Sequence, residues 1–369
     1  MKSRAAVLYE PNQRLQIEEI DVSGPMAGEV LVKMHSASIC HMDMLAKQGK
    51  LNHTRYPTIL GHEGAGEVVE VGSDVKNLLV GDRVVPLYVP ECGQCPSCMS
   101  AKTNLCTALD HTQMLGVMPD GTTRYHLNGQ PIYHFMGTSC LSEYIVVPEI
   151  ALARISHQVD MKSACLLGCT LTTGLGAVMN VARITPGSTV AVFGLGGIGL
   201  SVIQAAVMSQ AARIIGIDTN INKFNLAQKF GASTCINPRD HSDSIETVIK
   251  NITDGGVDFA FECIGFSETM QSALACTRPG WGKAVLLGVA DTNDRIDMQP
   301  GLLTSGRTFQ GARFGGVKGR SQLPEFAEQC INGEIMMNDL ITHALALEDV
   351  NLAFDLQHSG ESIRSVITF

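Results

Sequence analysis

Short apolar segments separated by turn residues fill the first 170 or so residues of the chain. Val30–Met34, Gly66–Val71 and Asp82–Leu87 are rich in β-formers, and Gly, Pro, Asn and Asp interrupt the sequence between them. This spacing is typical of short strands in a barrel. The pattern therefore predicts a barrel-like β domain in this part of the protein.

The pattern changes near residue 185, where longer apolar runs alternate with helical periodicity. Thr189–Phe193 is a buried-strand run, and apolar residues recur at helical spacing from Leu200 onward. Further strands are expected at Ile214–Ile217, Thr234–Ile236, Val257–Phe261 and Lys283–Leu287, with helices between them, such as Lys223–Phe230. Strands alternating with helices predict a parallel, doubly wound sheet. The last fifty or so residues are mixed and are expected to return to the first domain.

Composition limits the partners of the protein. The chain has 369 residues, 45% of them hydrophobic and 17% charged, which is ample for two domains with separate cores. Its net charge is −9 and no stretch is rich in Lys or Arg, so no nucleic acid or membrane partner is expected. No apolar run suits a signal peptide or a membrane span. Twelve cysteines without a secretion signal favour reduced thiols and metal ligation, which predicts a cytoplasmic protein.

Four cysteines are closely spaced between residues 92 and 106. They follow the pattern Cys92-x2-Cys95-x2-Cys98-x7-Cys106. Four thiolates at this spacing can surround one tetrahedral Zn²⁺, and all-sulfur sites of this kind are usually structural. The alternative is a pair of disulfides or a chance cluster. The spacing favours a structural zinc lobe.

A glycine-rich segment follows the first strand of the predicted sheet. Gly194, Gly196 and Gly199 lie between that strand and a helix, with Gly197 among them. In this context the first glycine permits a tight turn, the second lets the backbone approach a pyrophosphate, and the third lets helix and strand pack closely. Phosphates would then meet the free N–H groups at the helix start. A glycine turn in an unrelated α/β domain is the alternative.

Asp218 stands at the end of the next predicted strand. This is the spacing expected for a carboxylate that binds the ribose 2′-hydroxyl of a dinucleotide. A carboxylate there would repel a 2′-phosphate, so the sequence predicts NAD rather than NADP.

Several separated motifs together carry a resemblance to a known family. Spacing alone cannot join Cys40, His62 and Cys169, which lie in Ile39–Asp43, Gly61–Glu63 and Leu167–Gly174. With the cysteine lobe and the glycine segment, however, these motifs resemble the medium-chain, zinc-dependent alcohol dehydrogenases over essentially the whole chain. The matched branch is the long form with a zinc lobe, which includes class I, class III and aryl-alcohol dehydrogenases. Further matches are Phe135–Ser139, Phe314–Gly316 and Ser359–Arg364.

The resemblance implies an α/β architecture with two domains. A GroES-like β-barrel catalytic domain would cover residues 1–170, with the zinc lobe at about 88–110. A Rossmann NAD-binding domain would cover 171–313, and residues 314–369 would return to the catalytic domain. The family also implies a homodimer or homotetramer, formed through the sheet edge around Trp281–Val289 and Thr308–Gly311.

The resemblance also implies the site residues and the reaction. Cys40, His62 and Cys169 would hold a catalytic zinc, and the four lobe cysteines a structural one. Asp43 would orient His62, and Glu63 would lie behind the metal. The family pattern places Thr173 beside the nicotinamide, Lys223 on the adenosine ribose, and His41 and Arg364 on the pyrophosphate. The implied reaction is NAD-linked oxidation of a primary alcohol to its aldehyde, and the reverse, with zinc lowering the pKa of the alcohol.

Two positions near the predicted catalytic zinc depart from the family pattern. Met42 stands where a Ser or Thr usually passes on the alcohol proton, and Leu45 replaces a frequent relay histidine. Protons could instead travel by water, the cofactor ribose or His41. The alternatives are an enzyme that works mainly on carbonyls or an unusual substrate, an NAD(P)H-dependent reductase of an activated C=C or C=N bond, and a non-enzymatic scaffold. Because the zinc ligands are intact, we favour alcohol chemistry.

The predicted substrate pocket is apolar. Motif matches place Tyr88, Phe135 and Met136 in it beside Met42, which favours an apolar, allylic or aromatic primary alcohol as the small-molecule substrate. The related glutathione-dependent formaldehyde dehydrogenases use a basic residue after the zinc lobe and an acidic group for the glutathione amine. Here those positions hold Asp110 and Leu51, which predicts that glutathione adducts are poor substrates.

Overall fold

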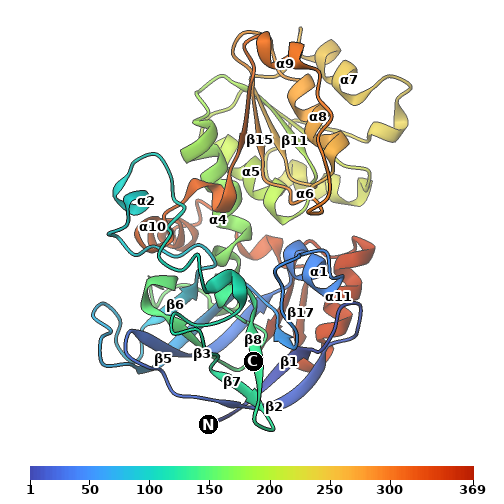
Figure 1. Ribbon diagram of the computed structural model, residues 1–369. Helices are drawn as coiled ribbons and strands as arrows, with labels where there is room; N and C mark the ends of the chain where they lie inside the picture. The colour runs from blue at the N-terminus through green and yellow to red at the C-terminus, as the bar shows by residue number, and fades with distance from the viewer. The chain divides into compact units, whose positions relative to one another are not determined.

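The computed structural model describes residues 1–369, which divide into two compact units. The first comprises Met1–Thr170 and Lys318–Phe369, and the second comprises Leu171–Val317. The chain thus leaves the first unit at residue 170 and returns to it near the end, as Figure 1 shows by the blue, green and red ribbons that share this unit. The return lies four residues beyond the expected boundary at 313, after Phe314–Gly316.

The first unit contains a closed barrel and a separate seven-stranded sheet. The barrel has the strand order β1 (Lys2–Leu8), β2 (Gln16–Val22), β7 (Tyr125–Leu127), β8 (Gln130–His134) and β4 (Thr58–Ile59). The sheet has the order β10 (Leu152–Ile155), β6 (Arg83–Pro86), β5 (Glu63–Val71), β3 (Glu29–Ser38), β18 (Ser365–Thr368) and β17 (His343–Ala346), and β9 (Tyr144–Pro148) also pairs with β3. The three strands predicted from sequence, β3, β5 and β6, are therefore confirmed, and they lie side by side in the sheet.

Short helices complete the first unit. They are α1 (His41–Lys47), α2 (Pro96–Met99), α3 (Met161–Ala164), α10 (Gly319–Ile331) and α11 (Val350–Ser359). Strand β18 forms antiparallel pairs with β3, from Val366 with Ser38 to Thr368 with Ser36. This pairing places the end of the chain directly beside the residues that lead into α1.

The second unit is a six-stranded parallel sheet with helices between its strands. Its strand order is β13 (Thr234–Ile236), β12 (Arg213–Ile217), β11 (Thr189–Phe193), β14 (Phe259–Glu262), β15 (Lys283–Leu286) and β16 (Thr308–Gly311). The helices are α5 (Gly197–Met208), α6 (Phe224–Lys229), α7 (Ile245–Ile252), α8 (Ser267–Ala275) and α9 (Pro300–Thr304); α4 (Thr170–Gly176) leads into this unit. The predicted doubly wound sheet is confirmed.

Several predicted boundaries in this unit differ from the structure by one or two residues. Strand β14 begins at Phe259 rather than Val257, because Val257 makes only an isolated bridge to Thr277. The helix expected from Lys223 begins at Phe224, after a short 3₁₀ turn. No single helix in the structure is long and apolar enough to cross a membrane, although one bent pair, Met161–Gly168 with Thr170–Ala182, has the necessary length and composition.

Candidate metal centres and cofactor site

Asp43 organises the chain around the first predicted metal centre. Helix α1 begins at His41, and the fully buried Asp43 carboxylate accepts a hydrogen bond from the backbone N–H of Cys40 at 3.0 Å. Its other oxygen accepts from the N–H of Gly61 at 2.9 Å and lies 3.3 Å from His62 Nδ1. One carboxylate therefore fixes the segments that carry Cys40 and His62, and it leaves Nε2 of the imidazole free to ligate.

The structure brings together four metal-binding side chains that are far apart in sequence. The ligand atoms of Cys40, His62, Glu63 and Cys169 all lie within 4.8 Å of one another, and all four residues are buried. His62 is completely buried and its Nε2 has no hydrogen-bond partner. A buried imidazole nitrogen without a partner is costly, whereas two sulfurs and one imidazole nitrogen are a donor set that suits zinc. The residues present therefore fit a zinc ion.

The pKa value of each of these residues depends on the charges and hydrogen bonds of the others. The pKa of Cys40 is lowered, because Cys169 hydrogen bonds to its sulfur and His62 lies close by, although burial opposes the shift. The same hydrogen bond, together with burial, raises the pKa of Cys169. Burial disfavours the His62 cation, but Asp43 and Cys40 outweigh this and raise its pKa. A cation among these groups would favour both thiolates and a neutral imidazole, as metal binding requires.

Glu63, the fourth member of this cluster, lies next to the guanidinium of Arg364. Burial, reinforced by Cys40, raises the pKa of Glu63 to about 8. Arg364 is also buried, with its Nε 3.7 Å from Glu63 Oε2 and 2.6 Å from Thr170 Oγ1. The sequence reasoning missed Thr170, which follows a ligand cysteine and shows no pattern that would mark it. The assignment of Arg364 to the pyrophosphate stays a prediction, as does that of His41, which lies exposed at the start of α1.

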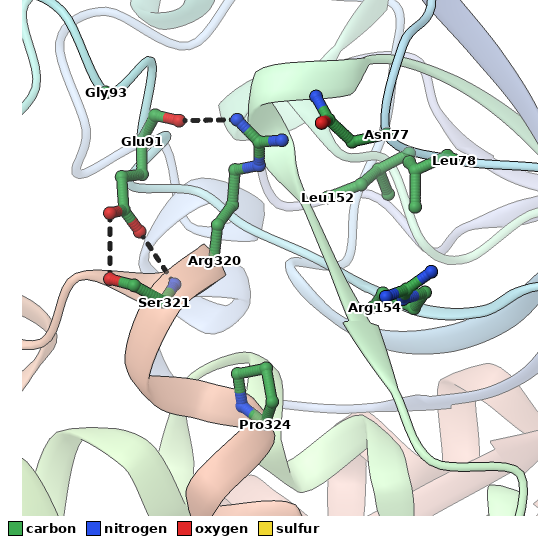
Figure 2. A pocket seen from close by; sticks show the side chains of 9 residues that line it. All are labelled: Asn77, Leu78, Glu91, Gly93, Leu152, Arg154, Arg320, Ser321 and Pro324. Atoms are coloured by element: carbon green, nitrogen blue, oxygen red, sulfur yellow. Dashed lines mark hydrogen bonds between the residues drawn. The ribbon is translucent and has the colours of Figure 1, made fainter.

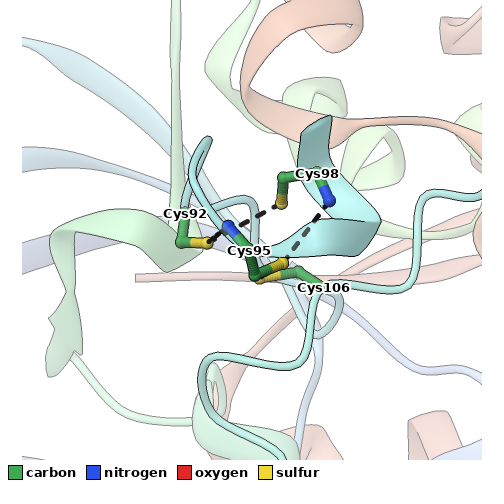
Figure 3. A group of neighbouring side chains, drawn as sticks. All are labelled: Cys92, Cys95, Cys98 and Cys106. Carbon is green, nitrogen blue, oxygen red and sulfur yellow. Dashed lines mark hydrogen bonds between the residues drawn. The ribbon is translucent and has the colours of Figure 1, made fainter. Parts of the chain in front are cut away.

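The four lobe cysteines also converge, as Figure 3 shows. The sulfurs of Cys92 and Cys98 lie 3.8 Å apart, as do those of Cys95 and Cys106. Zinc–sulfur bonds of about 2.3 Å in a tetrahedron require sulfur separations of about 3.8 Å. Hydrogen bonds from the backbone of Thr107 and Cys98 lower the pKa of Cys95 to about 6, which favours its thiolate. All twelve cysteines are free thiols, so the disulfide alternative is not realised.

Residues at the N-terminal end of helix α10 form hydrogen bonds with this lobe. Lys318 Nζ donates to the carbonyl oxygens of Cys98 and Ser100 at 2.6 and 2.7 Å. Arg320 donates to the carbonyl of Glu91 at 3.1 Å, while the Glu91 carboxylate accepts from the N–H and hydroxyl of Ser321 (Figure 2). Glu91, Arg320 and Ser321 line a pocket of about 380 Å³ that is bounded on another side by Leu78, Leu152 and Arg154. This pocket contains none of the predicted site residues.

The glycine segment of the second unit forms a turn that suits a dinucleotide phosphate. Gly194 has a φ of +91°, which favours glycine, and a Cβ on Gly199 would lie only 1.9 Å from the Gly194 carbonyl oxygen. A Cβ on Gly196 would meet nothing within 4 Å, so the backbone faces open space there, and helix α5 begins at the next residue, Gly197. These are the roles expected of a fingerprint that approaches a pyrophosphate.

Asp218 lies at the end of β12 beside this turn. Its Oδ2 accepts from the N–H of Leu195 at 2.8 Å and from Lys223 Nζ at 3.1 Å, and its Oδ1 accepts from the N–H of Asn220. The carboxylate is thus fixed against the glycine turn, and Lys223 is joined to it. These residues fit the NAD site predicted from sequence. Thr173 lies buried in α4, and its role stays a prediction.

Aromatic side chains surround His62. The rings of Tyr88 and Phe135 lie edge-on to the imidazole, with centroids 5.4 and 6.1 Å away, and the Tyr88 hydroxyl is 3.7 Å from Cys169 Sγ. Gln113, which sequence reasoning also missed, donates to the carbonyl oxygens of Tyr88 and Met136 at 3.2 and 2.8 Å. This buried amide fixes the aromatic wall, although nothing in its local sequence pattern indicates that role.

The two units and their sites define the class of the protein: it is a zinc-binding, nicotinamide-dependent dehydrogenase. Family models agree: residues 26–157 match the alcohol dehydrogenase GroES-like domain, and residues 197–332 match the zinc-binding dehydrogenase domain. The chain belongs to the zinc-dependent, medium-chain alcohol dehydrogenase family. It is an enzyme that takes two zinc ions and NAD and interconverts an alcohol and its aldehyde or ketone.

Relatives and solved structures extend the match over the whole chain. An S-(hydroxymethyl)glutathione dehydrogenase from Synechocystis is 54% identical over 100% of both chains, and one from Escherichia coli O157:H7 is 51% identical over the same extent. The crystal structure of an alcohol dehydrogenase zinc-binding domain protein from Burkholderia ambifaria has a TM-score of 0.93 at 28% identity, covering 100% of this chain and 99% of the other. Benzyl alcohol dehydrogenase from Acinetobacter calcoaceticus gives 0.92 at 27%, with the same coverage.

Proposed function

We propose that this enzyme oxidises an apolar, allylic or aromatic primary alcohol with NAD, and reduces the corresponding aldehyde. The observation that carries the proposal is the pair of aromatic rings, Tyr88 and Phe135, that pack against His62, with the buried Met136 next to Phe135 in sequence; these side chains offer apolar contacts. The likeness to a benzyl alcohol dehydrogenase supports it. The identity with S-(hydroxymethyl)glutathione dehydrogenases favours the glutathione adduct instead. Against that substrate, Leu51 is buried and uncharged, and Asp110 is an exposed anion.

The roles of the site residues follow from their contacts. Cys40, His62 and Cys169 would hold the catalytic zinc, which when bound acts as a Lewis acid toward the substrate oxygen. Asp43 holds the His62 ring in orientation, and the buried aromatic rings keep water from the imidazole. In the second unit, Asp218 would accept the ribose hydroxyls of NAD, and the glycine turn would receive the pyrophosphate.

A substrate panel followed at the NADH absorbance tests the proposal. We expect the kcat/KM for benzyl or cinnamyl alcohol to exceed that for S-(hydroxymethyl)glutathione by about 10²-fold, because Asp110 repels the glutathione carboxylates and Leu51 cannot pair its amine. Equal or greater activity with the glutathione adduct would refute the proposed substrate and assign the relatives' activity to this chain.

A charge reversal makes this comparison sharper. Asp110→Arg should raise kcat/KM for the glutathione adduct by about tenfold and leave benzyl alcohol unchanged, since only the adduct carries carboxylates. Asp74→Arg, which reverses another exposed carboxylate of the same unit, is the matched control. A similar gain in both variants would point to general electrostatic attraction rather than to a site at residue 110.

Met42 provides a separate test of the proton route. It is the second residue of α1 and is partly exposed. Restoring a hydroxyl by Met42→Thr should raise kcat for alcohol oxidation several-fold at neutral pH, because proton transfer by a placed group contributes about 10²–10⁴-fold when it limits the rate. Met42→Leu should leave the pH profile of kcat unchanged. If the Thr variant also has the parent profile, the missing hydroxyl is irrelevant to catalysis.

We further propose a cytoplasmic homodimer or homotetramer. A cytoplasmic location would keep the thiols reduced, which suits a chain with two cysteine-containing metal sites. Strand β16 lies at the edge of the parallel sheet, its side chains are largely exposed, and Trp281 nearby is 65% exposed. An edge strand with open backbone groups can pair with a second copy of the chain. Light scattering on the purified protein measures the molar mass of the assembly, and so the number of chains in it, directly.

A further inference from the structure

Thr170 joins two buried ionisable side chains, Glu63 and Arg364, at the predicted catalytic metal site. Its hydroxyl accepts a hydrogen bond from Arg364 Nε at 2.6 Å and donates one to Glu63 Oε1 at 2.6 Å. All three side chains are buried, with Thr170 and Glu63 fully inaccessible. Nothing in the predicted reaction uses this hydroxyl.

The direction of these bonds is fixed by chemistry. A guanidinium only donates, so the hydroxyl oxygen must accept from Arg364, and its single proton is left for the carboxylate. Arg364 is itself held in place, because its second nitrogen donates to the carbonyl oxygen of Ile363 at 2.8 Å. The hydroxyl is therefore a rigid link that fixes Glu63 Oε1.

The other oxygen of Glu63 has no such link. Oε2 has no hydrogen-bond partner and lies 3.7 Å from Arg364 Nε, beyond hydrogen-bond distance. Glu63 nevertheless belongs to the group whose ligand atoms lie within 4.8 Å of one another with Cys40, His62 and Cys169. A free carboxylate at this distance is a potential fourth protein ligand, which would occupy the position that a substrate oxygen needs.

We propose that Thr170 is a positioning residue that holds Glu63 back from the catalytic metal and so keeps the substrate position open. The hydroxyl acts through Glu63 and touches neither substrate nor cofactor. The inference rests on the metal site alone and is independent of which alcohol is the substrate.

Thr170→Val tests this role, because valine keeps the shape of the side chain but cannot make either bond. With Co²⁺ placed in the catalytic site, the variant should show shifted visible d–d bands without substrate, since a carboxylate oxygen in the fourth position changes the ligand field. The KM for the alcohol should rise about fivefold, with a smaller change in kcat, because the released carboxylate would compete with the substrate oxygen for the metal.

Thr170→Ser is the matched control. It keeps the hydroxyl and should restore both the visible bands and the KM. The proposal is overturned if the valine variant, with circular dichroism and lobe zinc like those of the parent, keeps the parent bands and KM. It is also overturned if KM falls, which would mean that Arg364 captures the released carboxylate, or if serine fails to restore the bands. Because the bands are read without substrate, failure of the proposed alcohol specificity would leave this result unaffected.

Discussion

Cys169→Ser should abolish alcohol oxidation while leaving the protein folded. The buried thiol lies with Cys40 and His62 in one ligand cluster, and a serine hydroxyl stays neutral where a thiolate is needed. Loss of Lewis-acid stabilisation worth about 4 kcal/mol corresponds to a decrease in kcat/KM of roughly 10³-fold or more. Metal analysis should find the zinc content reduced from about two ions per chain to about one, because the four-cysteine lobe is untouched.

Cys165→Ser is the matched control for this experiment. Cys165 is also completely buried and lies four residues before Cys169, but it belongs to neither metal cluster. It should retain two zinc ions and most of the activity. A titration with NADH, monitored by fluorescence, should give similar affinities for NADH in both variants. Retention of two zinc ions and of alcohol oxidation by Cys169→Ser would refute the proposed ligand set.

Local pattern was sufficient to predict the second unit. Its central strands β11 and β12 are largely buried apolar runs, and its strands alternate with helices, so β11, β12 and β13 could be placed within one residue. The glycine turn was predictable for a similar reason, because Gly194 and Gly199 each meet a local steric requirement. Local pattern failed to predict a strand boundary where tertiary contacts determine it. Val257, for example, is apolar but lies outside the continuous strand β14.

The catalytic cluster could not be predicted from spacing alone. Cys40, His62 and Cys169 lie at the start of a helix, before a strand and before another helix, and no local rule brings those ends together. Antiparallel pairing of β3 with β5 joins Ser38 to Glu63, which places the first two ligands side by side. The family resemblance supplied that information in advance, and the structure explains it physically. Contacts such as those of Gln113 and Thr170 depend on the finished packing and leave no sequence signature.

We expect the structural lobe to depend on its metal for its conformation. Helix α2 is only four residues long, and the lobe sulfurs are held at tetrahedral separations by a chain that buries little apolar surface. The contacts from Lys318 and Arg320 reach backbone oxygens that flank Cys92 and Cys98. A lobe without zinc would therefore lose its own conformation and also release the start of α10.

Cys98→Ser should accordingly lower the apparent midpoint of thermal unfolding by about 10 °C or more. Structural zinc contributes roughly 10–16 kcal/mol to folding in isolated zinc-finger peptides. At about 2.1 cal/mol/K of unfolding entropy per residue, a loss of ~8 kcal/mol would lower the midpoint of this 369-residue chain by about 10 °C. Cys330→Ser, in α10 but outside both metal clusters, should change the midpoint by only a few degrees. The folded fraction of the Cys98 variant should still show the visible bands of Co²⁺ at the catalytic site, because those ligands come from other segments. A midpoint equal to that of the parent, with one zinc ion lost, would mean that the lobe is held by its contacts with α10 rather than by the metal.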